Sequence, residues 1–181
     1  MRVLAHLGVD VDKRDEHGRT PLMNCALVDD ERWAVGLART LLEHGARSVP
    51  RDRLGFTALH YACIRRRPAL VDVLLAAADF DVRAVDRRGN ASLHYAAAMG
   101  DCAITSALLA AYRRYCLPVT AVNRAGETAL EFAHRSGNAD CVQMIRDVQV
   151  EAITAAVRGK SSISETQLPI NERSQVKYNM Q

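Results

Sequence analysis

The sequence of 181 residues has little of what marks several protein classes. Only 5 prolines and 10 glycines are present, which argues against a collagen-like chain and against a largely disordered one. Aromatic residues make up 5%, which is low for a β-sandwich. No apolar run approaches the roughly 18 residues of a membrane-spanning helix, and the first residues lack the apolar stretch of a secretory signal. We therefore expect a folded protein of the cytoplasm or nucleus.

Cysteine is present in an odd number, and no two of the 5 cysteines form a CxxC pair. They are Cys25, Cys63, Cys102, Cys116 and Cys141. Disulfide frameworks and zinc knuckles use even or closely spaced sets, so we expect reduced thiols. No HExxH or triad-like pattern is present either, and a lone pair of equivalent histidines, His60 and His94, is a poor metal site. The sequence therefore predicts no catalytic site, no cofactor and no metal.

The net charge is small, but the basic residues are almost all arginine. The net charge is only +3, too small to indicate nucleic acid by itself, yet 21 arginines stand against 3 lysines. Hydrophobic residues make up 49%, enough for a packed core, and the 28 alanines favour helix. The positions of the arginines therefore matter more than their number.

Four segments of the chain share one pattern: glycine, any residue, a small or β-branched residue, any residue, then leucine. The segments are residues 18–22, 55–59, 89–93 and 126–130. Their glycines are 37, 34 and 37 residues apart, and an Asp or Asn stands three residues before each. Two copies continue with His-Tyr-Ala, at His60 and His94. Recurrence of several residue types in four registers indicates an internal repeat.

Each copy has the signals of a turn followed by two helices. The Asp or Asn and the glycine suit a tight turn with a residue at positive φ, and the threonine after them is able to cap a helix. A second helix is expected from Pro68 in the second copy and after Asp101 in the third. Leucines such as Leu74 and Leu108 then form an apolar ridge. One such pair cannot bury its apolar face alone, so neighbouring pairs must stack.

This pattern resembles the ankyrin repeat, which has a period of about 33 residues and the signature T-P-L-H-x-A. The resemblance implies an all-α fold, an α-solenoid of stacked helix-turn-helix repeats with β-turn or hairpin tips. It also implies a non-catalytic scaffold for protein–protein interaction. Departures are local: Ala91-Ser92 replaces Thr-Pro, and Met23 and Glu131 stand where the family usually has histidine.

The repeat register divides the chain into segments. We expect a partial repeat over residues 1–14 and a repeat domain over 15–148, with repeats at about 15–51, 52–85, 86–122 and 123–148. A helical extension is expected over 149–158 and a disordered tail over 159–181. The start in mid-repeat is typical of a fragment, a truncated gene model or a degenerate cap. Extra residues are expected in or before the second helix of the first copy, near 28–33, and in a longer second helix of the third copy.

The resemblance also implies a binding surface where the repeat tips and first helices form a concave face. Basic residues at the tips are Lys13, Arg14, Arg19, Arg51, Arg53, Arg83, Arg87, Arg88 and Arg124. A ladder of guanidinium groups suits an acidic partner segment, and the aromatic residues beside it suit apolar anchors. The predicted partner-binding residues are Arg53, Phe56, Tyr61, Arg65, Arg87, Arg88, Tyr95, Met99 and Arg124.

Several alternatives stay open from the sequence alone. The basic tips also fit a merely solvated rim, and the aromatic residues fit simple packing against the next repeat. The chain also fits a structural segment of a larger array, such as that of a channel or multidomain scaffold, with its partner site elsewhere. A phosphoinositide- or nucleic-acid-binding surface is a remote third reading, and a nucleic-acid surface would have denser charge and more lysine.

Overall fold

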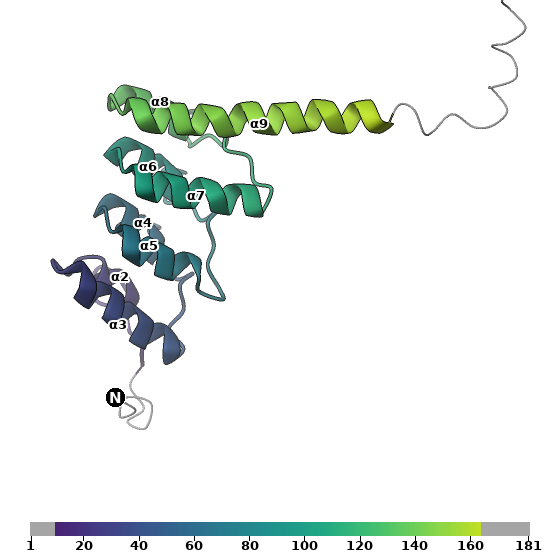
Figure 1. The fold of residues 1–181 in the computed structure, drawn as a ribbon. Coiled ribbons are helices and arrows are strands. Elements are labelled where there is room, and N and C mark those ends of the chain that lie inside the picture. The colour runs from purple at the N-terminus through teal and green to yellow at the C-terminus, as the bar shows by residue number, and fades with distance from the viewer. Residues whose placement is uncertain (1–9, 164–181) are drawn as a thin grey trace, which may run out of the picture. The chain divides into compact units, whose positions relative to one another are not determined.

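The computed structural model describes residues 10–163, with side chains up to residue 155. In this range the chain forms four pairs of helices in two layers (Figure 1). The inner helices are α2 (Pro21–Cys25), α4 (Ala58–Ile64), α6 (Ser92–Met99) and α8 (Ala129–Arg135). The outer helices are α3 (Glu31–Glu43), α5 (Pro68–Leu75), α7 (Cys102–Arg114) and α9 (Ala139–Ile163). Each inner helix contacts the next inner helix, and α3, α5 and α7 contact one another in the same order.

This arrangement confirms the predicted all-α repeat solenoid. The chain divides into two compact units, Met1–Arg146 and Asp147–Gln181. In the second unit the structure describes only the part of α9 that ends at Ile163. The described residues include no helix that is both long and apolar enough to cross a membrane.

The repeat tips are tight turns, each held by the side chain of the Asp or Asn three residues before the glycine. Asp52 Oδ1 accepts the backbone N–H groups of Leu54 (2.9 Å) and Phe56 (2.8 Å). Gly55 has a φ of +87°, which a side chain rarely adopts. The same bonds recur at Asp15, Asp86 and Asn123. In the third and fourth tips, antiparallel bridges Val85↔Ala91 and Val122↔Thr128 close the turn.

The departures from the repeat signature leave the helix starts intact, because different side chains meet the same need. Glu131 Oε2 accepts the backbone N–H of Thr128 at 2.6 Å, and His94 Nδ1 accepts that of Ala91 at 3.1 Å. In the first repeat the sulfur of Met23 accepts the corresponding N–H at 3.4 Å. The cap at Ala91 lacks only the hydroxyl that threonine supplies elsewhere.

The extra length of the first repeat lies inside its second helix rather than before it. All four outer helices begin 13 residues after the glycine of their repeat. Helices α3 and α7 have 13 residues, whereas α5 has 8. The longer spacings therefore lengthen the outer helices.

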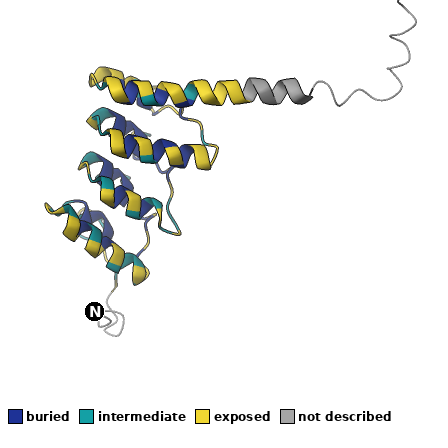
Figure 2. Ribbon diagram, in the orientation of Figure 1, coloured by how far each residue is buried: buried dark blue, intermediate teal, exposed yellow. Residues whose placement is uncertain are grey.

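The core runs between the two layers (Figure 2). Helices α5 and α7 contribute large aliphatic side chains to it: Leu70, Val71, Leu74, Ile104 and Leu108 are all buried. In α3 the buried positions are the small residues Ala34 and Ala38. The hydrophobic ridge that the sequence indicates is thus strongest in the central repeats.

The last outer helix is longer than the repeat requires. It reaches Ile163, so it spans residues 149–158 and continues past residue 159, where the sequence analysis begins the tail. One glycine costs about 1 kcal/mol inside a helix, which does not by itself end a helix of 25 residues. Residues 164–181, and residues 1–9 of the expected partial repeat, lie outside the described residues.

Gly36 gives a direct test of the α3 assignment. It lies on the exposed side of α3, and a Cβ added there meets no atom within 4 Å. Because alanine is about 1 kcal/mol more favourable than glycine in a helix, Gly36→Ala is expected to raise the free energy of unfolding by about that amount. Urea denaturation measures it. A lower midpoint would mean that residue 36 is not helical or is not open to solvent.

Candidate functional site

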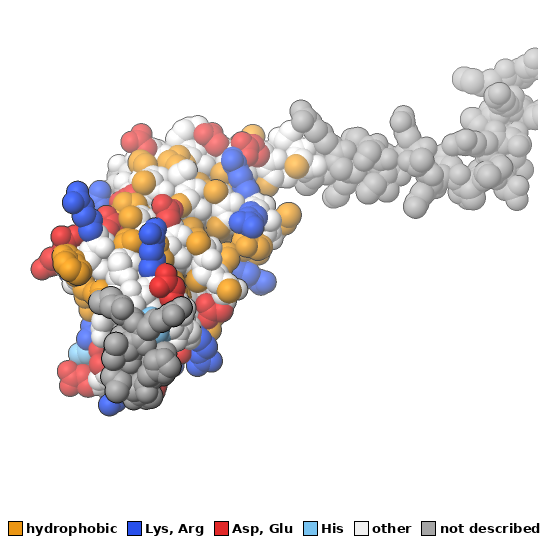
Figure 3. All heavy atoms as spheres, turned by 60° about the horizontal axis from the view of Figure 1, so that its bottom comes forward, with side chains coloured by type: hydrophobic (Ala, Val, Ile, Leu, Met, Phe, Trp, Pro, Cys, Tyr) orange, Lys and Arg blue, Asp and Glu red, His pale blue; other side chains and the backbone are white. Residues whose placement is uncertain are grey.

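The tips and inner helices of the third and fourth repeats border an open groove of about 560 Å³, hereafter the tip groove. It is lined by Arg87, Arg88, Asn90, Tyr95, Asn123, Arg124, Ala125, Glu127, Phe132 and Arg135. Its walls are therefore two successive repeat tips, and its floor comes from α6 and α8. On the face drawn in Figure 3, basic and acidic side chains are interspersed among hydrophobic ones.

Three arginines of the tip groove carry unpaired charge. Arg87 and Arg88 lie on the third tip and Arg124 on the fourth, and all three are exposed. Among the described residues none of their guanidinium groups has a hydrogen bond or ion-pair partner. Their backbones, in contrast, are tied to the preceding tip: Arg124 donates its N–H to Arg88 O at 2.9 Å, and Arg87 donates to Leu54 O at 3.0 Å. The fold thus fixes where these side chains begin and leaves their charged ends open.

The remaining charges in the tip groove pair with each other. Arg135 Nη1 forms an ion pair with Glu127 Oε1, and its guanidinium lies 4.6 Å from the centre of the Phe132 ring. A hydrogen bond from Asn123 and the contact with Arg135 lower the pKa of Glu127. The one carboxylate of the groove is therefore already neutralised, and the three free arginines set its sign.

The tyrosines of the inner helices have committed hydroxyl groups. Tyr61 donates to Asp52 Oδ2 at 2.7 Å, and Tyr95 donates to Asp86 Oδ2. Burial, together with the bond to the adjacent carboxylate, raises the pKa of each tyrosine to about 12. These hydroxyl groups are used to hold the tips, so a bound ligand would contact the tyrosine rings rather than the hydroxyls.

The rings form a cluster that links the second and third repeats. The centre of the Phe56 ring is 5.6 Å from that of Tyr61 and 5.6 Å from that of Tyr95, both edge to face. In the next repeat Phe132 contacts His94, with centres 5.3 Å apart. The side chains of these two phenylalanines and two tyrosines are half-buried. They therefore pack against neighbouring repeats and still expose part of their surface.

The structure brings some of the predicted site residues together and leaves others apart. Those in the tip groove are Arg87, Arg88, Tyr95 and Arg124. Phe56 adjoins it through Tyr95, and Tyr61 contacts Phe56 in turn. Arg53 is exposed on the second tip, where its backbone N–H bonds His17 O at 3.2 Å. Arg65 and Met99, at the ends of α4 and α6, are exposed and do not line the groove.

Some arginines of the expected ladder are structural. Arg14 Nη1 donates to Arg51 O at 2.6 Å, Arg51 Nη1 donates to Val85 O at 2.7 Å, and Arg19 Nε donates to Asp15 at 2.8 Å. These three join or brace tips, so the ladder is shorter than the sequence indicates. Conversely, Arg135 and the amides Asn90 and Asn123 line the groove although they were not among the predicted partner-binding residues.

The two equivalent histidines connect repeats. His60 accepts the Thr57 backbone N–H on Nδ1 (3.2 Å), which leaves Nε2 to donate to Asn90 O (3.1 Å). His94 Nε2 contacts Glu127 O at 3.3 Å in the same way. Each histidine therefore joins its own helix start to the next tip. Within the described range, no group of three His, Cys, Asp or Glu side chains is placed to hold a metal ion.

These histidines predict a pH dependence of stability. Burial lowers the pKa of His60 and of His94 below the usual 6.5, so below that pH the unfolded chain binds more protons than the folded one. The free energy of unfolding is expected to be flat just above pH 7 and to fall as the pH drops below 6.5. The slope reaches about 1.4 kcal/mol per pH unit for each histidine.

Urea denaturation at pH 7.5 and 5.5 checks this dependence. Hydrogen bonds from Tyr95 and backbone groups outweigh burial and lower the pKa of Asp86 below 3.8, so its contribution is lost only in a more acidic range. His17→Gln, at an exposed tip, serves as the control and is expected to keep the same dependence. Equal stability at both pH values would show that the two histidines are not buried in the neutral form.

Comparison with known proteins adds independent findings. A family model of ankyrin repeats in three copies matches residues 1–86. Human ankyrin repeat domain-containing protein 63 is 38% identical over 155 residues, which are 85% of this chain and 40% of that protein. The mouse protein of the same name is 39% identical over 135 residues, 75% of this chain and 34% of that protein. Chicken inversin is 40% identical over 79 residues, 44% of this chain and 6% of inversin. The chain thus spans well under half the length of these relatives.

Proposed function

The chain belongs to the ankyrin repeat family, whose repeats generally mediate protein–protein interaction, and from this we propose that it is a non-catalytic module that binds an acidic segment of a partner protein on its concave face. The tip groove is the centre of the proposed site.

The observation that carries the proposal is the set of three unpartnered arginines on adjacent tips. Arg87, Arg88 and Arg124 all line one groove, and its only carboxylate, Glu127, is paired with Arg135. A guanidinium group binds a carboxylate through two parallel hydrogen bonds, and this pairing is geometrically specific. A partner segment with two or three acidic residues would supply the counter-charges that the fold leaves out. Arg53 on the second tip extends the positive edge.

The aromatic floor supplies the second part of the proposed interaction. Tyr95 and Phe132 are half-buried in the groove, and Phe56 and Tyr61 continue the floor toward the second repeat. Rigid, partly exposed rings lose little conformational entropy on binding and are frequent anchors of protein interfaces. An apolar partner side chain between acidic residues would lie on these rings.

The chemistry of the groove supports binding rather than catalysis. A general acid or base works best with a pKa near the operating pH. In the tip groove the pKa of Glu127 is lowered by Asn123 and Arg135, and the pKa of Tyr95 is raised to about 12 by burial and Asp86. Neither group is suited to move a proton at neutral pH.

Selection from a displayed library of random peptides, followed by binding kinetics at two salt concentrations, tests the proposal. We expect selected peptides to be rich in Asp and Glu. The double variant Arg87→Glu with Arg124→Glu is expected to bind them at least about tenfold more weakly at low salt, mainly through slower association. The matched control is Arg32→Glu with Arg39→Glu, which makes the same charge change on α3, outside the tip groove.

Two results would overturn the proposal. One is selection of peptides without enrichment in acidic residues. The other is equal weakening by the tip-groove and the α3 variants, which would mean that overall charge rather than the groove governs binding. Unfolding midpoints of both double variants show that the arrays remain folded.

A further inference from the structure

The outer helices of the third and fourth repeats each carry a cysteine in their first turn. Cys102 is the first residue of α7 and is exposed, whereas Cys141 is the third residue of α9 and is fully buried. Both belong to the compact unit that ends at Arg146. One thiol is thus open to solvent and the other faces inward.

Their surroundings place the two sulfur atoms on the same side of α7. Cys141 Sγ lies 3.5 Å from Thr105 Oγ1. Thr105 follows Cys102 by three residues, and side chains three apart share one face of a helix. Burial raises the pKa of the Cys141 thiol, and interaction with the Cys102 side chain raises it further. The Cys141 thiol thus contacts Thr105, and Cys102 lies one helical turn before Thr105 on the same face of α7.

We propose that Cys102 and Cys141 form a reversible intramolecular disulfide when the protein meets a hydroperoxide, and that this bond ties the third repeat to the fourth. The exposed Cys102 is the thiol that an oxidant reaches, and Cys141 is the partner that resolves the oxidised sulfur.

The reaction balances with one hydroperoxide. The Cys102 sulfur, as thiolate, attacks the terminal peroxide oxygen; the O–O bond breaks, an alcohol or water leaves, and Cys102 becomes a sulfenic acid. The Cys141 sulfur then attacks the Cys102 sulfur; an S–S bond forms, the S–O bond breaks, and the released hydroxide takes the Cys141 proton as water. Two thiols are oxidised by two electrons in all, and a dithiol reductant reverses the change.

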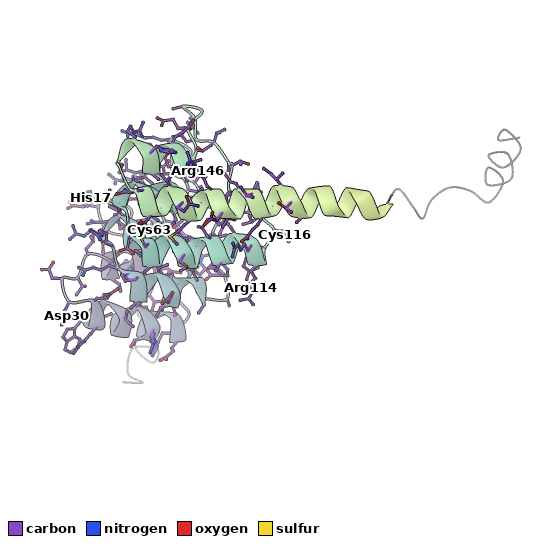
Figure 4. The ribbon with its side chains drawn as sticks, turned by 45° about the horizontal axis from the view of Figure 1, so that its top comes forward. His17, Asp30, Cys63, Arg114, Cys116 and Arg146 are labelled. Atoms are coloured by element: carbon purple, nitrogen blue, oxygen red, sulfur yellow. The ribbon has the colours of Figure 1, made fainter. Side chains whose placement is uncertain are left out.

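The other cysteines lack this combination. Cys25 and Cys63 are buried, and burial raises the pKa of the Cys25 thiol to about 11 and raises that of Cys63 as well. Cys116 is exposed, but it lies just past the opposite end of α7 (Figure 4). It therefore serves as a matched control, an accessible thiol on the same repeat.

The bond would act on the geometry of the tip groove. A link between residues 102 and 141 closes a loop that contains the fourth tip and α8, and with them Arg124 and Phe132. The opposite wall, with Arg87 and Arg88, lies on the third tip. Oxidation would therefore restrain one wall of the groove relative to the other. The disulfide itself does not depend on the proposed function.

Trypsin separates the relevant cysteines, which makes the proposal directly measurable. Cys102 falls in the peptide of residues 89–113, Cys116 in 115–124 and Cys141 in 136–146. The dilute full-length chain is treated with hydrogen peroxide, quenched in acid, alkylated, digested and analysed by mass spectrometry. We expect peptides 89–113 and 136–146 to appear linked, and to separate after dithiothreitol. We also expect Cys116 to remain in unlinked peptides and the oxidised chain to unfold at a higher temperature than the reduced one.

Variants distinguish this pairing from general oxidation. Cys102→Ser is expected to abolish the link and the rise in unfolding temperature, and Cys116→Ser is expected to change neither. Cys141→Ala is expected to leave Cys102 as a sulfenic acid, which dimedone captures. Because Cys102 and Cys116 are exposed, neither serine variant threatens the fold. Failure to link 89–113 with 136–146, or a dominant link through Cys116, would overturn the proposal whatever the peptide-binding results.

Discussion

Replacing Leu74 or Leu108 with alanine is expected to lower the free energy of unfolding by about 2–5 kcal/mol. Leu74 is 1% exposed in α5 and Leu108 is 0% exposed in α7, and these two helices contact each other. Truncation removes apolar contacts and leaves a cavity that the rigid helix pair fills only in part. Chemical denaturation, followed by far-ultraviolet circular dichroism, measures the change.

Leu37→Ala is the control for this prediction. Leu37 lies on α3 and is 44% exposed, so its truncation is expected to cost less than about 1 kcal/mol. Repeats contact only their neighbours, so loss of a central ridge loosens the array on both sides of it. Denaturation midpoints unaffected by Leu74→Ala and Leu108→Ala would mean that the ridge is not buried.

The fold could be predicted from the sequence because each repeat carries the same local structural signals. The Asp or Asn, the glycine and the leucine recur in register, and they set the turn and the start of the inner helix. Even Ala91, which lacks the expected hydroxyl, stays at a helix start because His94 accepts its N–H. Where the sequence departs from the repeat signature, a side chain three residues later still accepts the N–H at the helix start.

The length of the outer helices was harder to place. In the first repeat the spacing shows that residues are added, but acidic residues occur both in a loop before a helix and in the first turn of a helix. The sequence therefore does not show whether the added residues precede the helix or belong to it. Asp30 is the N-cap and accepts the Arg32 N–H at 2.8 Å, so α3 starts in the common register and carries the added length itself. Pattern alone does not distinguish these two positions.

The candidate site was predicted only in part, because a tip residue faces either the neighbouring tip or the solvent. Arg51 and Arg53 are two residues apart, yet Arg51 bonds Val85 O across the repeats while the Arg53 side chain has no partner among the described residues. Likewise the sequence located Tyr61 and Tyr95 but not the bonds that commit their hydroxyls to Asp52 and Asp86. Such outcomes depend on how adjacent repeats pack, which no single copy encodes.

Packing between tips also decides which glycines are indispensable. Gly89 and Gly126 occupy the same position in successive repeats, with φ of +82° and +78°. A Cβ at Gly89 would lie 2.9 Å from Arg124 N, whereas one at Gly126 would meet no atom within 4 Å. The pair therefore separates the cost of backbone conformation from the cost of repeat stacking.

Gly89→Ala is accordingly expected to lower the free energy of unfolding by about 2–5 kcal/mol, and Gly126→Ala by only about 1–2 kcal/mol. The left-handed conformation costs an alanine about 1–2 kcal/mol at either site. At Gly89 overpacking adds about 1–3 kcal/mol, because the new methyl group displaces Arg124 N from its hydrogen bond with Arg88 O. Urea denaturation of both variants gives the difference. Gly55→Ala, whose Cβ would lie 2.9 Å from Arg87 N, is expected to follow Gly89→Ala. If all three substitutions cost the same, the tips do not stack as closely as the structure places them, and the tip groove loses the fixed backbone on which its arginines depend.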